Sequence, residues 1–86
     1  MSKTKVVHCK REAYDVYIGR PSIWGNPFVI GKDGTREEVV EKYRRWLLTQ
    51  PDLLGKIVIL KGKTLGCWCK PQACHGDILA ERANNE

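Results

Sequence analysis

The stretch TLGCWCKPQACHGDILAERA, residues 64–83, decides the fold because it predicts a strand, a loop and a helix in close succession. Thr64–Cys69 is typical of a strand, and the Lys70-Pro71-Gln72 run predicts a loop, because proline interrupts regular structure. A last helix is expected from residue 74 or 75 to residue 83, with its apolar side chains buried. In α/β proteins, loops that follow strands in this way tend to carry ligand sites.

Two short strands and a long loop are expected at the start of the chain. Val6–His8 and Asp15–Gly19 carry branched and aromatic side chains that suit strands, and Lys10–Tyr14 is the turn expected between them. Arg20–Thr35 is expected to be a loop, because it contains the breakers Pro21, Gly25, Pro27, Gly31 and Gly34. A loop of this length inside so small a domain is usually functional.

The clearest helix begins after Thr35. Thr35-Arg36-Glu37-Glu38 matches a capping box, in which the Thr35 hydroxyl and the Glu38 side chain each accept a hydrogen bond from a backbone amide at the helix start. Apolar side chains recur at three- and four-residue spacing and predict one buried face: Val39, Tyr43, Trp46 and Leu47. This helix is expected to end before Pro51.

Asp52–Leu60 fits two kinds of element. One is a short helix capped by Asp52; the other is a buried strand from Lys56, which the branched run Ile57-Val58-Ile59 favours locally. The predicted order is therefore β-β-loop-α-(α or β)-β-α. We expect a small single α/β domain over residues 1–86, with a short mixed sheet and two to three helices.

Composition limits the class of protein. The chain has 86 residues and a net charge of +5, a modest basic excess that suits either a solubilising face or an anionic partner. No secretory signal is visible in Met1–Lys5, and the longest apolar run, Ile57–Leu60, is far too short to cross a membrane. The crowding of Cys67, Cys69 and Cys74 is unlike a disulfide framework. We therefore expect a reduced, cytoplasmic protein with a metal site or reactive thiols and no membrane partner.

The cysteine-rich segment matches a set of zinc ligands. On a strand, Cys67 and Cys69 point to the same face, and Cys74 and His75 fall in the first turn of the next helix. Three sulfurs and one imidazole are the ligands of a closed tetrahedral zinc site, which would also stabilise a thin core. Adjacent Cys74 and His75 do not easily reach one ion. The predicted metal ligands are Cys67, Cys69, Cys74 and His75, with His8 and Cys9 as alternatives.

Two other interpretations of this segment need no metal. A helix N-terminus attracts anions and lowers the pKa of a nearby thiol, so Cys74, with His75 beside it and Gly76 permitting close backbone approach, suits a phosphate-binding or reactive-thiol site. Otherwise the cysteines are small buried hydrophobes. For Asp77, the alternative to a ligand-binding role is that of an ordinary acid in the first turn of the helix. Trp68 is expected in the core, with stacking on a base or sugar as its alternative.

The segment Tyr17–Phe28 has the composition of a binding loop. Arg20 offers a forked, charged donor for phosphate or carboxylate, and Trp24 offers a stacking surface. Ser22 and Asn26 add hydrogen-bonding groups, as a nucleotide or a single-stranded base requires. In the alternative interpretation, Trp24 fills the core and Asn26 caps the turn. The predicted ligand-binding residues are Arg20, Ser22, Trp24, Asn26 and Asp77.

Together these segments resemble a known family. The residues that carry the likeness are Val6–His8, Asp15–Arg20, Trp24–Phe28, Leu60-x-Gly62-Lys63-x-Leu65 and Cys67–Asp77. Over nearly its whole length the chain resembles the uncharacterised "domain of unknown function 4326" family of bacteria and phages. The resemblance implies no particular activity, but it emphasises the same loop and the same cysteine segment. Cys9 lies outside the family pattern, which favours the four predicted metal ligands over Cys9.

Three functions fit these observations. The first is binding of a nucleotide-like or other anionic ligand between Arg20–Asn26 and Cys67–Asp77, which predicts that both segments line one pocket. The second is a zinc-stabilised module that binds nucleic acid through Lys56–Lys70, with a strong dependence on salt. The third is a small adaptor without chemistry of its own, with an exposed apolar patch and no pocket. No established catalytic motif is present, so enzymatic activity stays open.

Overall fold

The structure is a computed structural model that describes residues 3–70 and 72–85. Its elements are β1 (Lys5–His8), β2 (Val16–Tyr17), α1 (Arg36–Leu47), α2 (Pro51–Lys56), the 3₁₀ helix η1 (Ile57–Leu60), β3 (Thr64–Cys67) and α3 (His75–Asn84). Three α-helices and a short three-stranded sheet confirm the small α/β domain. Pro71, in the loop predicted after β3, lies outside the described residues. Within the described ranges, none of the helices has the length and apolar character needed to span a membrane.

β3 is the central strand of the sheet, with β1 on one edge and β2 on the other. Both pairings are parallel, and Gly66 of β3 lies level with Val7 of β1 and Tyr17 of β2. The prediction of a mixed sheet is therefore wrong. The segment between β1 and β2 is not a hairpin turn, because it carries the chain to the opposite edge of β3. All three strands end at the same edge of the sheet, near His8, Tyr17 and Cys67.

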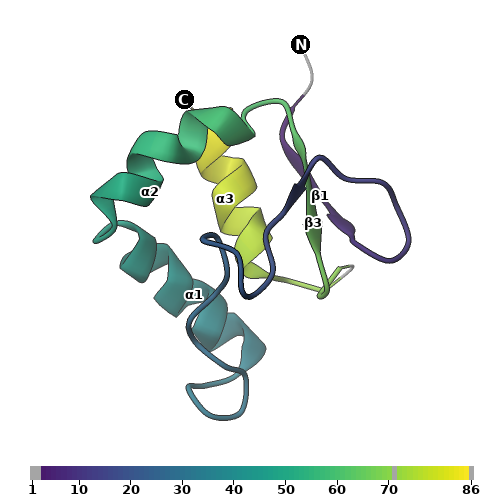
Figure 1. The fold of residues 1–86 in the computed structure, drawn as a ribbon. Coiled ribbons are helices and arrows are strands. Elements are labelled where there is room, and N and C mark those ends of the chain that lie inside the picture. The colour runs from purple at the N-terminus through teal and green to yellow at the C-terminus, as the bar shows by residue number, and fades with distance from the viewer. Residues whose placement is uncertain (1–2, 71, 86) are drawn as a thin grey trace.

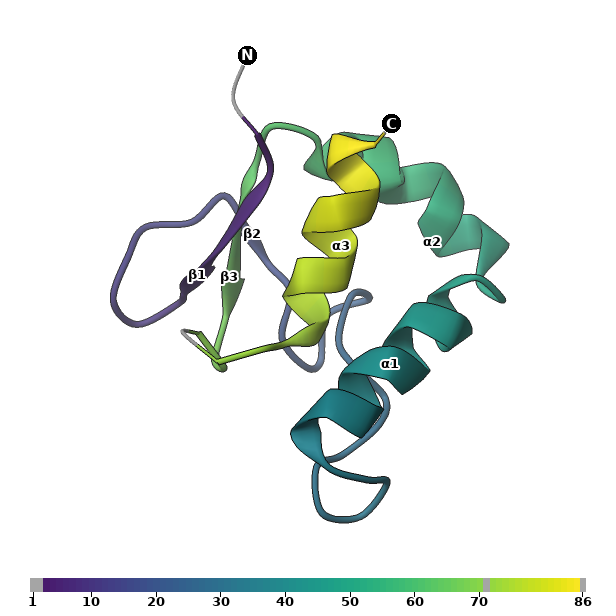
Figure 2. The same ribbon diagram turned by 180° about the vertical axis from the view of Figure 1, so that it is seen from behind.

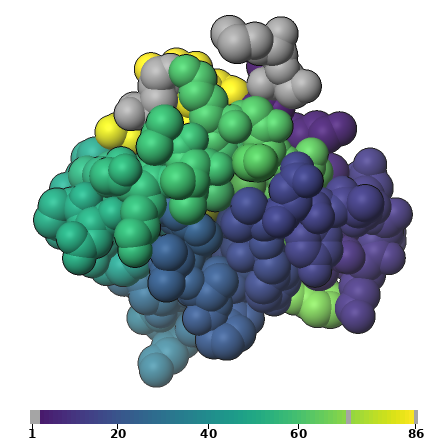
Figure 3. All heavy atoms as spheres, turned by 45° about the horizontal axis from the view of Figure 1, so that its top comes forward, coloured from purple at the N-terminus to yellow at the C-terminus, as the bar shows by residue number. Residues whose placement is uncertain are grey.

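α3 packs against the sheet and is flanked on its other side by α1 and by the α2–η1 segment (Figures 1 and 2). In the space-filling view, the purple and blue N-terminal segments lie beside the green α2–η1 region (Figure 3). The core is therefore built from side chains of elements far apart in the sequence. Its largest fully buried apolar members are Ile18, Tyr43, Leu47, Ile57, Leu60, Leu65 and Leu79.

The predicted capping box at the start of α1 is confirmed. The Glu38 amide donates to Thr35 Oγ1 at 3.2 Å, and the Thr35 amide donates to Glu38 Oε1 at 2.9 Å. The hydrogen bond from the Thr35 amide, with a further contribution from the Thr35 side chain, holds the pKa of Glu38 below its usual value. α1 ends before Pro51, as expected, but Trp46 is only partly buried. The buried side chains of α1 are Val39, Tyr43 and Leu47.

The ambiguous segment before β3 is helical throughout, so its strand alternative is wrong. α2 carries Pro51 in its first turn, and η1 follows directly. Ile57 and Leu60 are buried, whereas Val58 and Ile59 are exposed. A spacing of three residues between buried positions belongs to a 3₁₀ helix, while a strand would bury alternate residues. The branched side chains favoured a strand locally, and packing against α3 overrode that preference.

Gly76 sets the distance between the start of α3 and the sheet. A Cβ atom at Gly76 would lie 2.6 Å from Ile18 Cδ1 and 2.9 Å from Val6 Cγ1. Ile18 is fully buried, so its side chain has no free space into which to retreat. The helix therefore approaches the sheet more closely than any residue with a side chain would allow. Gly55 in α2 is the contrasting case, because nothing lies within 4 Å of its Cβ position.

We predict opposite effects of alanine at these two helical glycines. Gly76→Ala should lower the free energy of unfolding by about 1–3 kcal/mol, as overpacking typically does. Gly55→Ala should raise it by about 0.5–1 kcal/mol, because alanine is the better helix former. Urea denaturation of both variants measures the two values. If Gly76→Ala is as stable as Gly55→Ala, the close approach of α3 to the sheet is incorrect.

Candidate functional site

A cleft of about 410 Å³ opens where the strands end, between the loop after β2 and the segment after β3. The prediction that both segments line one pocket is thus met by the geometry. The residues around the cleft are Tyr17, Gly19, Arg20, Asn26, Phe28, Val29, Ile30, Arg36, Val40, Cys67, Trp68, Cys69, Ala73 and His75. Four predicted site residues line no part of it: Ser22, Trp24, Cys74 and Asp77.

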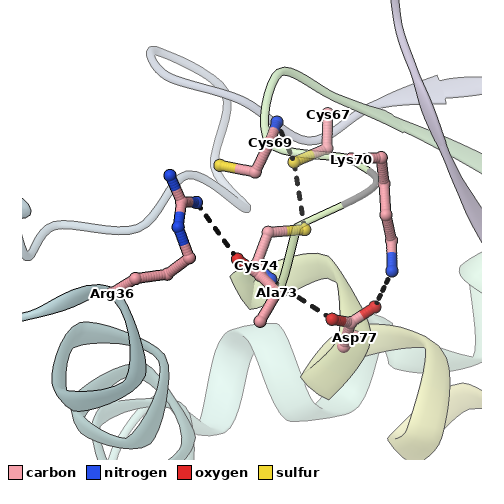
Figure 4. A network of polar contacts seen from close by, with 7 residues as sticks. All are labelled: Arg36, Cys67, Cys69, Lys70, Ala73, Cys74 and Asp77. Carbon is pink, nitrogen blue, oxygen red and sulfur yellow. Dashed lines mark hydrogen bonds and ion pairs between the residues drawn. The ribbon is translucent and has the colours of Figure 1, made fainter.

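Two guanidinium groups and no carboxylate stand among the described residues that line the cleft. Arg20 is exposed, in the loop after β2. Arg36 is the first residue of α1, and its Nη1 donates to the Ala73 carbonyl at 3.2 Å (Figure 4). That contact holds the start of α1 against the segment that leads into α3. Sequence reasoning missed Arg36, although its place directly after the Arg20–Thr35 loop is a signal that would have found it.

Asn26 ties the loop after β2 to α1. Its Nδ2 donates to the Val39 carbonyl at 3.2 Å, and its Oδ1 accepts from the Phe28 amide at 2.9 Å. Asn26 is also buried, at 9 % exposure. The side chain thus holds the shape of the loop while one edge of it faces the cleft.

Trp24 lies in the core rather than in the cleft. Its side chain is 3 % exposed, and its carbonyl accepts a hydrogen bond of 2.8 Å from the Tyr43 hydroxyl. A ring covered in this way offers no face for stacking, so the structure supports the alternative in which Trp24 fills the core. Ser22 Oγ is buried without a hydrogen bond to any of the described residues.

Trp68 is the exposed aromatic residue of the cleft, and the prediction that it lies in the core is wrong. It is 54 % exposed, because it follows the last residue of β3 at the edge of the sheet. Its indole N–H donates to the Tyr17 hydroxyl at 2.7 Å, and its ring meets the His8 ring edge-on at 5.9 Å between centroids. Lys10 Nζ lies 5.4 Å from the centre of the ring. Trp68 therefore stands in a fixed orientation at the rim.

Asp77 serves the start of α3. One carboxylate oxygen accepts from the Cys74 amide at 3.2 Å, and the other pairs with Lys70 (Figure 4). The Cys74 sulfur in turn accepts from the Asp77 amide, which completes a capping box with cysteine in the usual place of serine. Asp77 thus acts as the first-turn acid of the alternative interpretation. Its pairing also neutralises one lysine of the basic stretch Lys56–Lys70.

Cys67 and Cys74 form a buried thiol pair. Cys67 donates to Cys74 across 3.0 Å between the sulfurs, and both residues are at most 2 % exposed (Figure 4). This hydrogen bond, together with burial, raises the pKa of Cys67 well above its usual value. The same hydrogen bond lowers the pKa of Cys74, although burial opposes it. Cys74 is therefore the sulfur of the pair that holds negative charge more readily.

His75 is buried and anchored to the end of β2. Its Nε2 lies 2.7 Å from the Ile18 carbonyl oxygen, and its ring meets that of Tyr43 at 5.0 Å between centroids. Burial lowers the pKa of His75 from its usual 6.5. Because a carbonyl oxygen only accepts, Nε2 carries the proton of the neutral ring, and Nδ1 keeps its lone pair.

One ligand atom from each of Cys67, Cys74 and His75 lies within 4.8 Å of the others, so this group could hold a metal ion. Cys74 is extended, at φ −150° and ψ 168°, whereas His75 begins the helix. This change of backbone direction lets two adjacent side chains converge, against the expectation from sequence. Cys69 is not in the group: its sulfur points toward Arg36 (Figure 4). Cys9 is not in it either.

The buried imidazole predicts a loss of stability in mild acid. The unfolded chain protonates His75 near pH 6.5, while the folded chain resists protonation to a lower pH. The free energy of unfolding should therefore fall as the pH decreases from about 7 through this window. Urea denaturation across pH, with a chelator present, measures it. His75→Asn should flatten the dependence, and His8→Asn, which alters the only other histidine, should preserve it. Equal dependence in both variants would contradict this assignment.

Comparison with known proteins places the chain in a family. An uncharacterised 12.4 kDa protein of Enterobacteria phage T4, from the nrdA-td intergenic region, is 38 % identical over 85 residues, covering 93 % of this chain and 77 % of the phage protein. The uncharacterised protein R718 of Acanthamoeba polyphaga mimivirus is 39 % identical over 85 residues, covering 78 % of this chain and 65 % of the viral protein. No solved structure matches significantly. The pattern of the domain of unknown function DUF4326 matches residues 2–85, and the chain belongs to that family.

Proposed function

We propose that the cleft binds an anionic, phosphate-bearing ligand of nucleotide-like size. The observation that carries the proposal is that Arg20 and Arg36 both line a cleft with no acidic residue among its described lining. Guanidinium groups match phosphate oxygens in geometry as well as in charge, and two of them can clamp one phosphate group or two neighbouring ones. Arg20 and Arg36 stand near the two ends of the same long connection, which follows β2 and leads into α1.

The rest of the cleft suits the non-phosphate part of such a ligand. Its volume of about 410 Å³ falls within the roughly 300–1,000 Å³ of typical small-molecule sites. Phe28, Val29, Ile30 and Val40 supply apolar wall, and Trp68 supplies an exposed ring at the rim. A ligand with a charged end and a flat or apolar end fits this division better than a bare inorganic ion.

We predict that removing either cleft arginine weakens binding of inorganic pyrophosphate, the simplest probe of the phosphate site. Arg20→Ala or Arg36→Ala should raise the dissociation constant about 10- to 100-fold, the usual value of a charged hydrogen bond. Arg45→Ala is the matched control, because Arg45 lies on α1, is ion-paired with Glu41 and lines no part of the cleft. Isothermal titration calorimetry measures all four proteins.

The same titration separates the competing functions. If the Arg45 and Arg36 variants lose equal affinity for pyrophosphate, binding depends only on the net charge of the protein, and the proposed site is wrong. Binding of a single-stranded oligonucleotide that collapses with rising salt, and that Lys56→Ala or Lys63→Ala weakens while Arg36→Ala does not, would support the nucleic-acid-binding alternative instead. Absence of any anion binding would leave the adaptor alternative.

A second candidate function is zinc binding at Cys67, Cys74 and His75. The convergence of two sulfurs and one imidazole within 4.8 Å favours it, because zinc prefers these ligands. An ion there would link the end of β3 to the start of α3 and would stabilise a domain whose small size allows only a thin core.

The zinc proposal predicts metal content directly. Protein purified without a chelator should contain a single zinc ion per chain by elemental analysis, and Cys74→Ser should abolish it. Cys9→Ser is the control and should keep its zinc, because Cys9 is outside the ligand group. Zinc-free wild-type protein, or loss of zinc from the Cys9 variant, would contradict the assignment.

A further inference from the structure

Each atom of the Cys67–Cys74–His75 group has a hydrogen-bond partner that orients it. Cys67 Sγ accepts from the Cys69 amide at 3.3 Å, and Cys74 Sγ accepts from the amide of Asp77. His75 Nε2 bonds to the Ile18 carbonyl, which leaves Nδ1 for a metal. Ligands in metal sites are oriented by outer contacts of this kind: amides on sulfur, and a carbonyl on the second nitrogen of histidine.

The spacing of the group suits a small ion without rearrangement of the backbone. Zinc bound at about 2.3 Å from each sulfur, with tetrahedral angles, requires the sulfurs to be about 3.8 Å apart. The two sulfurs are 3.0 Å apart and all three ligand atoms lie within 4.8 Å of one another, so only small side-chain movements would be needed. Binding of a divalent ion would release both thiol protons to solvent and replace the Cys67–Cys74 hydrogen bond with two metal–sulfur bonds.

Three protein ligands leave one position of a tetrahedral ion to be filled. Cys67 and His75 line the cleft, while Cys74 lies behind them. Cys69, the obvious fourth ligand, is adjacent to Cys67 but lies outside the group of converging ligand atoms, and its sulfur points toward Arg36 (Figure 4). Structural zinc sites are closed by four protein ligands, whereas sites that engage a ligand have three and keep the fourth position open.

The charges around this position favour an anion. Two thiolates, one neutral imidazole and a divalent ion sum to zero, so the centre itself does not repel a negative ligand. Arg20 and Arg36 line the same cleft and add positive charge. An oxygen of a bound phosphate would then lie between the metal and the arginines.

We infer that Cys67, Cys74 and His75 form a three-ligand metal centre whose fourth position opens into the cleft and accepts an oxygen or nitrogen donor of an anionic ligand. This inference rests on the proposed function, since it uses the same cleft. It goes further by assigning the metal a direct role in ligand binding in addition to its stabilising one, and by excluding Cys69 from the ligand set.

Cobalt-loaded protein tests the inference, because Co²⁺ occupies zinc sites and its visible spectrum reports the number and kind of its ligands. Azide, a small anion that coordinates metals, and pyrophosphate should each change the spectrum in a saturable way. Cys69→Ser should keep the sulfur-to-cobalt charge-transfer intensity of the wild-type protein and should respond to both anions. Cys67→Ser should lose part of that intensity, and Cys9→Ser should not.

The outcomes separate this inference from the function on which it rests. A charge-transfer loss in Cys69→Ser, with no response to azide, would show a closed four-ligand site and overturn the inference. Pyrophosphate binding by calorimetry without any change in the cobalt spectrum would also overturn it while leaving the anion site intact. An azide response without pyrophosphate binding would support the open position and contradict only the proposed phosphate ligand. Failure of Co²⁺ to bind would overturn it outright.

Discussion

The hydrogen bond between His75 and the Ile18 carbonyl is the contact on which the rest of the site depends. It joins the first residue of α3 to the chain just past β2, at 2.7 Å. Gly76 allows this approach, because any side chain there would collide with Ile18 and Val6. The loop after β2 and the segment after β3 form the two walls of the cleft. The hydrogen bond that fixes the start of α3 to Ile18 therefore also holds these two walls in place relative to each other.

The chemistry of the site follows from what is buried and what is left open. The sulfurs of Cys67 and Cys74 and the ring of His75 are buried. In this site away from water, protons exchange with difficulty and a bound metal would be held firmly. Arg20 is exposed and Arg36 partly so, at the cleft itself, where positive charge can attract a ligand from solution. The proposed function rests on this arrangement, in which two sulfurs and an imidazole are buried behind a solvent-exposed, basic cleft.

Local signals predicted much of this structure. The capping box at Thr35 and the strand–loop–helix order around Cys67 needed only neighbouring residues, and both are present. Long-range packing decided what sequence reasoning missed, the strand order and the exposure of Trp68, and what it left open, the burial of Trp24. Arg36 directly follows the Arg20–Thr35 loop, but its hydrogen bond to Ala73 depends on the fold that brings α1 beside the segment before α3.

The central claim is that the two segments act as one anion site, and an amide NMR titration of ¹⁵N-labelled protein with pyrophosphate tests it most directly. The account predicts that amides of Gly19–Phe28 and of Cys67–His75 shift together along a single saturation curve, while those of Lys56–Lys63 stay in place. Shifts confined to Lys56–Lys63, or to one of the two segments alone, would contradict a shared site in the cleft.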